Sequence, residues 1–188
     1  MPLPPVSSIE SDRLIVRPVG ADDLGDLLDV NGDPQVTQFL PYATWQGLDD
    51  AAAWLERMQT LASAGTAQQL VVVRKQDRRV IGTVLLFRFD EGSARLEIGY
   101  VIGRAQWRQG FAREALVAAI GHAFDAMAVR RIEAEVNPAN QASDALLRNI
   151  GFTHEGVLRQ RWVAHGAAYD VNAYGLLASE WRQRLRGP

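Results

Sequence analysis

The segment that most constrains the fold of this chain joins an apolar strand to a helix through a turn of small residues. Residues 96–102 are rich in β-branched and aromatic side chains, and we expect them to form a strand that ends at Gly103. Downstream, apolar residues recur at helical spacing, which predicts a helix with one buried face. This face carries Ala112, Leu116, Ala119, Ala123 and Met127, with Ile120 and Phe124 beside them.

The turn between strand and helix suits an anion. Gly110 and Ala112 leave the backbone bare where the helix begins, so a bound group can approach the amides. Free N–H groups and the positive end of the helix dipole favour a phosphate. Many structural corners share this pattern, so the turn alone leaves phosphate binding open. The chain contains neither G-x-x-x-x-G-K-[ST] nor G-x-G-x-x-G, which argues against a P-loop and a dinucleotide fold.

A second strand–helix unit follows. Residues 131–136 alternate polar with apolar side chains and precede Asn137-Pro138, which predicts a strand and a turn. Asn140 is the expected N-cap of the next helix, and Gly151 closes it where a left-handed residue is wanted. The face expected to be buried carries Ala142, Ala145, Leu146, Asn149 and Ile150.

Together these units resemble the GNAT superfamily of acyl-CoA N-acyltransferases, and in particular its branch of Rim-type ribosomal-protein N-terminal acetyltransferases. The family's pyrophosphate motif, [Q/R]-x-x-G-x-[G/A], is matched by residues 107–112 after Ile102. Trp107 departs from the usual Gln or Arg, although an aromatic residue is common there in this branch. The branch's second motif, N-x-x-S followed by L and G-F, is matched by Asn140, Ser143, Leu146, Gly151 and Phe152.

The resemblance covers nearly the whole chain and implies a single-domain α/β fold, with a mixed, mostly antiparallel sheet and helices on both faces. The order of expected strands and helices agrees with this architecture. The acetyltransferase domain is expected over 9–188, after a flexible tail at 1–8 that contains three prolines. The resemblance implies acetyl-CoA as co-substrate. The residues expected to bind it are Tyr100, Val101, Ile102, Arg108, Gln109, Gly110, Phe111, Ala112, Arg113 and Asn140.

Two residues are candidates for proton transfer. Glu97 alternates with Ile98 and Tyr100, so it faces away from them, and it is the candidate base or water-ordering group. It could instead be a solvated carboxylate or the ion-pair partner of Arg95 or Arg88. A similar solvent-facing reading is preferred for Glu133 and Glu135.

Ser143 is the candidate donor toward the departing thiolate. Many enzymes of the superfamily place a Tyr four positions before the G-F pair, where this chain has Leu147. The resemblance implies that Ser143, one turn earlier, lies near the sulfur of CoA. The structural alternative is a second capping hydroxyl in the first helical turn.

The acceptor pocket is expected to be aromatic. Phe39, Tyr42 and Trp45 lie in a connection that the family folds over the substrate side, and Trp162 and Tyr169 flank the final turn opposite them. The alternative for each is ordinary core packing.

Composition excludes several classes of function. The 188 residues are 47% hydrophobic, contain no Cys and carry a formal net charge of −2, so neither disulfides nor nucleic-acid binding is expected. His122, His154 and His165 lack metal-ligand spacing, so no metal is expected, and the last two are expected at the surface. No membrane-spanning apolar run or signal peptide is recognisable, so a cytoplasmic protein without a membrane partner is expected. A monomer or homodimer is expected.

Three functions remain open from the sequence. The favoured one is acetyl-CoA-dependent transfer to a primary amine, with a protein N-terminal α-amine as acceptor. An α-amine has a pKa near 8, against roughly 10.4 for Lys, so a weak base deprotonates it more easily. The alternatives are a small-molecule amine (a metabolite, drug or polyamine) and a non-catalytic, regulatory acyl-CoA-binding module.

Overall fold

Eight strands form one sheet in the computed structural model, which describes residues 2–164 and 166–186. The sheet order is β1-β2-β3-β4-β5-β6-β8-β7, and every neighbouring pair is antiparallel except β5 and β6. The strands are β1 (Ile9–Glu10), β2 (Leu14–Pro18), β3 (Ala67–Arg74), β4 (Val80–Asp90), β5 (Arg95–Ile102), β6 (Arg131–Val136), β7 (Thr153–Ala164) and β8 (Ala167–Leu177). The expected mixed, mostly antiparallel sheet is confirmed.

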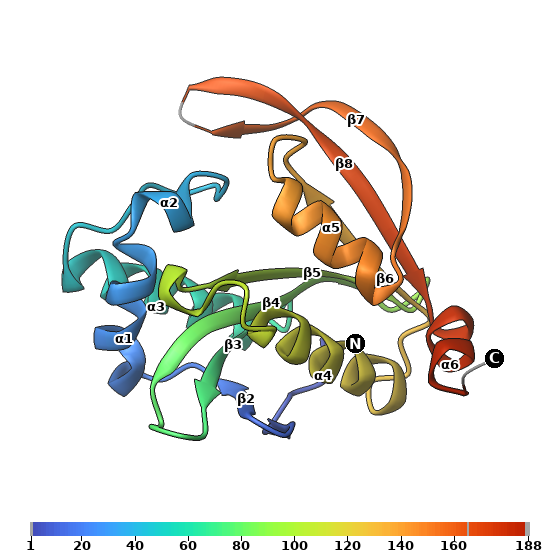
Figure 1. The fold of residues 1–188 in the computed structure, drawn as a ribbon, viewed down its shortest axis with the longest axis horizontal. Helices are drawn as coiled ribbons and strands as arrows, with labels where there is room; N and C mark the ends of the chain where they lie inside the picture. The colour runs from blue at the N-terminus through green and yellow to red at the C-terminus, as the bar shows by residue number, and fades with distance from the viewer. Residues whose placement is uncertain (1, 165, 187–188) are drawn as a thin grey trace.

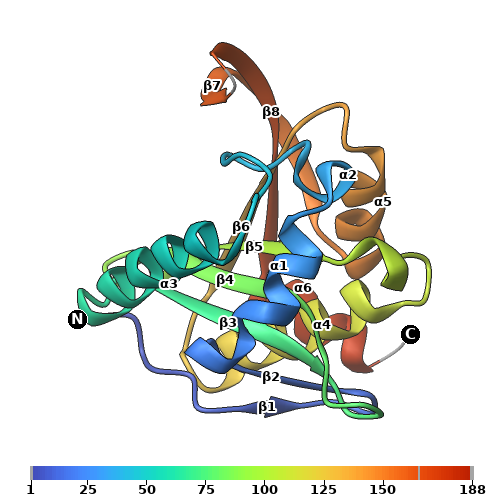
Figure 2. The ribbon, with the colours of Figure 1, turned by 90° about the vertical axis from the view of Figure 1, so that its left-hand side faces the viewer.

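Helices cover both faces of this sheet (Figures 1 and 2). In the described chain they are a short 3-10 turn (Ala21–Asp23) leading into α1 (Leu24–Asn31), then α2 (Pro34–Thr37), α3 (Leu48–Ser63), a second 3-10 turn (Arg104–Gln106), α4 (Phe111–Asp125), α5 (Gln141–Ile150) and α6 (Ala178–Arg186). A larger core forms where Leu116, Ile120 and Phe124 of α4 pack on the sheet. A smaller core on the opposite face joins α1 and α3, through Leu27 and Trp54, to the sheet.

The two parallel strands separate shortly after they pair. Residues 95–97 of β5 pair with 131–133 of β6. Beyond them, β5 continues against β4 as far as Ile102, while β6 continues against β8. Within the described residues, no strand pairs with 98–102 on the β6 side. This edge therefore offers backbone donors and acceptors to a ligand, because such groups seek hydrogen-bond partners.

Residues 3–6 pack against the domain, in contrast to the expected flexible tail over 1–8. Leu3 and Val6 are each 3% exposed and belong to the larger core. The Leu3 amide donates to the Gly65 carbonyl at 2.8 Å, and Gln68 donates from its side chain to the Pro4 carbonyl at 2.7 Å. Two apolar residues, each next to a proline, therefore anchor this segment beside β3.

Two helices bury a different face from the one expected. In α5, Leu147 and Ile150 are buried, whereas Ala142, Ala145 and Asn149 are exposed, because the helix is rotated toward its Leu147 side. For α3, the sequence predicts an N-cap at Asp49 or Asp50 and an apolar stripe that includes Leu61 and Ala62. The structure instead has Gly47 as the N-cap and leaves Leu61 and Ala62 exposed.

Candidate active site

The turn before α4 has the backbone of an anion site. Gly110 is the N-cap of α4 with φ +81°, a left-handed conformation that favours glycine. Arg108, two residues earlier, also has a positive φ, +60°. The Glu114 amide closes the first helical turn by donating to the Gly110 carbonyl at 3.0 Å. The amides of 111–113 therefore lie in the part of the helix that lacks intrahelical acceptors, where they are available to an anion.

Three side chains hold this turn in place. The Trp107 indole donates to the Ile102 carbonyl at 2.8 Å, so Trp107 ties the turn to the end of β5. Arg13 donates to the Gln109 carbonyl at 3.1 Å and lies over the Phe111 ring at 4.3 Å. Glu114 in turn accepts from Arg13 Nε at 2.6 Å. Sequence reasoning missed Arg13, since nothing near it marks a contact 96 residues away.

The expected cofactor-binding residues differ in which of their groups are accessible to a ligand. Arg108 and Arg113 are exposed, and Arg113 donates to the Asn149 side chain at 3.1 Å. The Gln109 side chain donates from Nε2 to the Ala105 carbonyl at 2.8 Å. Phe111 is buried in the larger core, so only its backbone can serve a ligand. Ala112 is half-buried.

Ser143 faces β5 from the first turn of α5. Asn140 caps this helix by accepting from the Ser143 amide at 3.1 Å, which confirms Asn140 as the N-cap. The Ser143 hydroxyl lies 2.5 Å from the Tyr100 hydroxyl, so it meets the sheet rather than capping the helix. Leu147 is fully buried in the larger core and contributes no polar group.

Glu97 is buried, at 6% exposure, and accepts from Arg88 Nη1 at 2.7 Å. The ion pair anticipated as an alternative role is therefore present, with Arg88 rather than Arg95. Arg88 has φ +51° in a bulge of β4 that turns its side chain toward Glu97. Burial raises the pKa of Glu97, and the positive charge of Arg88 partly opposes that rise.

The solvent-facing position expected for Glu135 is wrong. Glu135, expected on a solvated strand face, has a side chain only 9% exposed. It accepts from Arg161 Nε at 3.0 Å and from the Trp162 indole, because these side chains of β7 close over β6. Arg88 Nη1 lies 3.5 Å from Glu135 Oε1. One guanidinium thus links the two buried carboxylates, whereas Glu133, at 28% exposure, pairs with Arg95 and Arg131.

Glu97 and Ser143 lie on opposite faces of β5. Leu96 and Ile98 point into the larger core, so Glu97 between them points to the other face. Tyr100, like Ile98, faces the larger core and meets Ser143 there. The two candidate residues therefore flank the strand where β5 and β6 separate, rather than touching each other.

The expected aromatic pocket divides into two groups. Trp45 is 5% exposed and packs on Trp54 with ring centroids 5.4 Å apart, in the smaller core. Tyr42 lies beside Trp45 and donates to the Asn31 side chain at 3.0 Å. The structure therefore places Trp45 in the core, the role weighed as its alternative. Phe39 is half-buried.

Trp162 and Tyr169 form the second aromatic group. They are cross-strand partners near the tip of the β7–β8 hairpin, and Arg88 lies over the Trp162 ring at 5.0 Å. Burial and the nearby charge of Glu135 raise the pKa of Tyr169. These two residues therefore face the Glu97 side of the sheet, together with Arg88 and Glu135.

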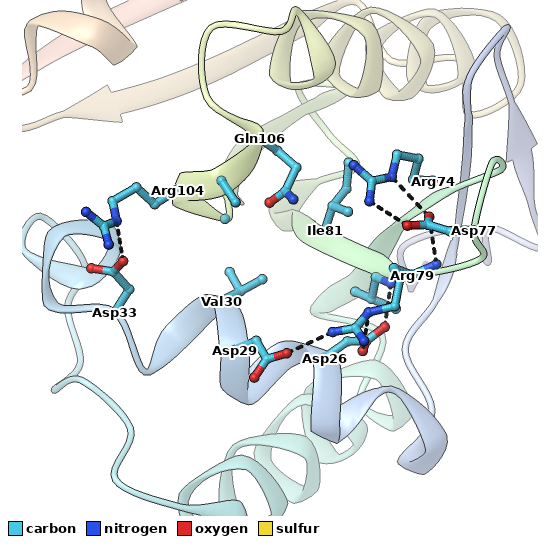
Figure 3. Close-up of a pocket in the computed structure, with 13 residues that line it drawn as sticks. Asp26, Asp29, Val30, Asp33, Arg74, Asp77, Arg79, Ile81, Arg104 and Gln106 are labelled. Atoms are coloured by element: carbon cyan, nitrogen blue, oxygen red, sulfur yellow. Dashed lines mark hydrogen bonds and ion pairs between the residues drawn. The ribbon is translucent and has the colours of Figure 1, made fainter.

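A cavity of about 580 Å³ lies away from these residues, between α1, the β3–β4 turn and the 3-10 turn after β5 (Figure 3). Its charged walls are already paired: Arg79 with Asp26 and Asp29, Arg104 with Asp33, and Arg74 with Asp77. A second cavity, of about 550 Å³, includes Gly110, Arg113 and Arg13 at the turn before α4. Neither cavity is lined by Glu97 or Ser143.

His154 is half-buried against Tyr174, with ring centroids 5.2 Å apart, so it is not the surface residue expected; His165 lies outside the described residues. Among the residues described, no group of three His, Asp or Glu could hold a metal ion. In the same residues, no helix has the length and apolar character needed to cross a membrane.

A sequence profile of the acetyltransferase (GNAT) domain matches residues 13–153, and the chain belongs to this family of N-acetyltransferases. It is 32% identical over 176 residues to the uncharacterized N-acetyltransferase p20 of Bacillus licheniformis, covering 94% of this chain and 99% of that protein. Over 186 residues it is 26% identical to the ribosomal protein uS5-alanine N-acetyltransferase of Escherichia coli, covering 94% of each. A crystal structure of spermidine N-acetyltransferase from Vibrio cholerae with CoA and spermine shares the fold, with a TM-score of 0.79 at 21% identity, covering 92% of this chain and all of that one.

Proposed function

We propose that this enzyme transfers the acetyl group of acetyl-CoA directly to a primary amine, with Glu97 as the base and Ser143 as the donor toward the departing thiolate. The observation that carries the proposal is the position of these residues on the two faces of β5, beside the unpaired edge at 98–102. Acetyl-CoA held by residues 107–112, here called the phosphate turn, would reach this edge from the Ser143 face. The amine would approach from the Glu97 face.

Each residue has a chemical role suited to amine acylation. The amine attacks only as the free base, so its proton must pass to a carboxylate or to ordered water. Burial raises the pKa of Glu97, which makes it a stronger base than a solvated Glu. Backbone amides on the free edge of β5 supply donors for the thioester carbonyl, and Ser143 supplies a hydroxyl at the sulfur.

We further propose a protein N-terminal α-amine as the acceptor. The pKa of an α-amine is near 8, so a weak base can deprotonate it. Glu97, which is ion-paired with Arg88, is such a base. A polyamine or another small amine is the competing acceptor, since one similar protein acts on a ribosomal protein and another was crystallised with spermine.

An acceptor panel tests this choice. The purified protein is given acetyl-CoA and one of three acceptors, and CoA release is measured. The acceptors are a short peptide that begins with a free Ala, an N-acetylated peptide whose only amine is a lysine side chain, and spermidine. Turnover of the free α-amine alone supports the proposal. Turnover of spermidine alone would assign a small-molecule acceptor. No release of CoA with any amine would contradict the catalytic roles given to Glu97 and Ser143.

The phosphate turn gives a prediction about the co-substrate. Acetyl-CoA should raise the Tm of the protein, since a ligand of the folded state stabilises it by mass action. Gly110→Val should weaken this binding by about tenfold or more, because a non-glycine residue at φ +81° is strained by about 1–2 kcal/mol. The turn then relaxes and misdirects its amides.

Gly47→Val is the matched control for this measurement. Gly47 has extended backbone, and an added Cβ there meets no atom within 4 Å. Thermal melts with and without acetyl-CoA should show the full shift for Gly47→Val and little for Gly110→Val. An equal rise of Tm with acetyl-CoA in both variants would show that the pyrophosphate does not bind at this turn.

A further inference from the structure

Tyr100 makes a contact that acetyl-CoA binding alone does not require. Its hydroxyl lies 2.5 Å from Ser143 Oγ, joining β5 to the first turn of α5. Strand alternation brings this about, because Tyr100 follows Ile98 on the face of the larger core. Asn140 caps the helix by accepting from the Ser143 amide, so the Ser143 hydroxyl is not needed as a cap.

The direction of this hydrogen bond follows from the acidity of the two hydroxyls. A phenol is the more acidic of the pair and so the better donor, while a Ser oxygen can accept and donate at once. Tyr100 is half-buried, and burial raises its pKa to about 12. The phenol therefore stays protonated and can donate to Ser143 Oγ at any physiological pH.

We propose that Tyr100 is a positioning residue for the acetyl transfer: it donates a hydrogen bond to Ser143 Oγ and thereby points the Ser143 O–H group at the sulfur of the departing thiolate. This inference rests on the proposed function. The chain of two hydrogen bonds stabilises the charge that collects on sulfur as the C–S bond breaks, and each bond polarises the next. Neither hydroxyl need lose its proton. Because Leu147 is buried and apolar, the phenol at this site comes from β5 and not from α5.

A second tyrosine provides a control for the purely structural alternative. Tyr174 of β8 is 1% exposed and donates to Asp144, the neighbour of Ser143 on α5. Tyr174→Phe also removes a phenol that ties the sheet to α5, but it leaves Ser143 untouched. If Tyr100 only tethers the helix, the two Phe variants should behave alike.

The test combines Tyr100→Phe, Ser143→Ala, the double variant and Tyr174→Phe. Tyr100→Phe should lower kcat about tenfold, as expected for one hydrogen bond to a developing charge, with the KM for acetyl-CoA nearly unchanged. In the Ser143→Ala background the same change should cost little, because its partner is gone. Equal losses in both backgrounds, or the same loss of kcat in Tyr174→Phe, would overturn the inference.

A binding measurement separates this inference from the proposed function, because it needs no acceptor. Thiolate absorbance of bound CoA is titrated against pH in wild type and variants. The thiol pKa of bound CoA should be lower than that of free CoA in wild type, and Tyr100→Phe should move it back toward the free value. An unchanged thiol pKa in Tyr100→Phe would contradict the positioning role, even if acetyl transfer itself is observed.

Discussion

Glu97→Gln should lower kcat/KM for the acceptor by about 10²–10⁴-fold near neutral pH, the usual contribution of a positioned general base. The amide retains a side-chain oxygen for Arg88 Nη1, which donates to Glu97 at 2.7 Å. The substitution therefore preserves most of the local contacts and removes the basicity. Initial rates with the best acceptor of the panel, measured over a range of pH, give the size of the effect.

The dependence of this defect on pH distinguishes a base from a structural group. Burial raises the pKa of Glu97, so the wild-type rate should rise with pH through an ionisation above the ordinary range for Glu. Below that ionisation, Glu97 is protonated and wild type approaches the variant. Above the pKa of the amine, the acceptor needs no base. The defect should therefore be largest between the two pKa values, and a defect of constant size would indicate a positioning role.

Two further variants identify the carboxylate responsible. Glu135→Gln removes the other buried carboxylate linked to Arg88, and it should give a smaller defect without the same pH profile. If the profile instead belongs to Glu135→Gln, the base is Glu135. Glu155→Gln removes a carboxylate that pairs with Arg131 on the sheet edge. It should leave the rate close to that of wild type.

The parts of this site that the sequence predicts are those set by neighbours along the chain. The left-handed Gly110, the cap at Asn140 and the left-handed Gly151 each follow from local backbone requirements. The strand–turn–helix order of both units follows from periodicity. These local rules predict the order of strands, turns and helices, and the resemblance to the GNAT superfamily supplied the sheet class.

The parts that the sequence missed depend on contacts between distant segments. Arg13 and Gln109 are separated by 96 positions, and Trp162 and Glu135 by 27. The alternation of β6 showed which side chains share a face with Glu135, but not that β7 would close over that face. The rotation of α5 likewise depends on packing against the larger core, which contains Leu147, whereas Ala145 is exposed.

Trp45→Ala should lower the free energy of unfolding by about 3–5 kcal/mol, the cost of truncating a buried Trp. Trp45 is 5% exposed and packs against Trp54 in the smaller core, so the substitution leaves a cavity between α3 and the preceding connection. Urea unfolding measures the loss. Leu48→Ala, at a side chain 55% exposed at the start of α3, should change stability far less.

The same variant decides whether Trp45 also contributes to the acceptor pocket. If it only packs the core, the folded fraction should bind acetyl-CoA in calorimetry and use the acceptor with a KM close to that of wild type. Trp162→Ala should then raise the acceptor KM, because Trp162 lies beside Glu135 and under Arg88. If Trp45→Ala has a near-normal free energy of unfolding and a raised acceptor KM, Trp45 belongs to the acceptor pocket. The acceptor would then reach Glu97 past the connection before α3, and not only past the β7–β8 hairpin.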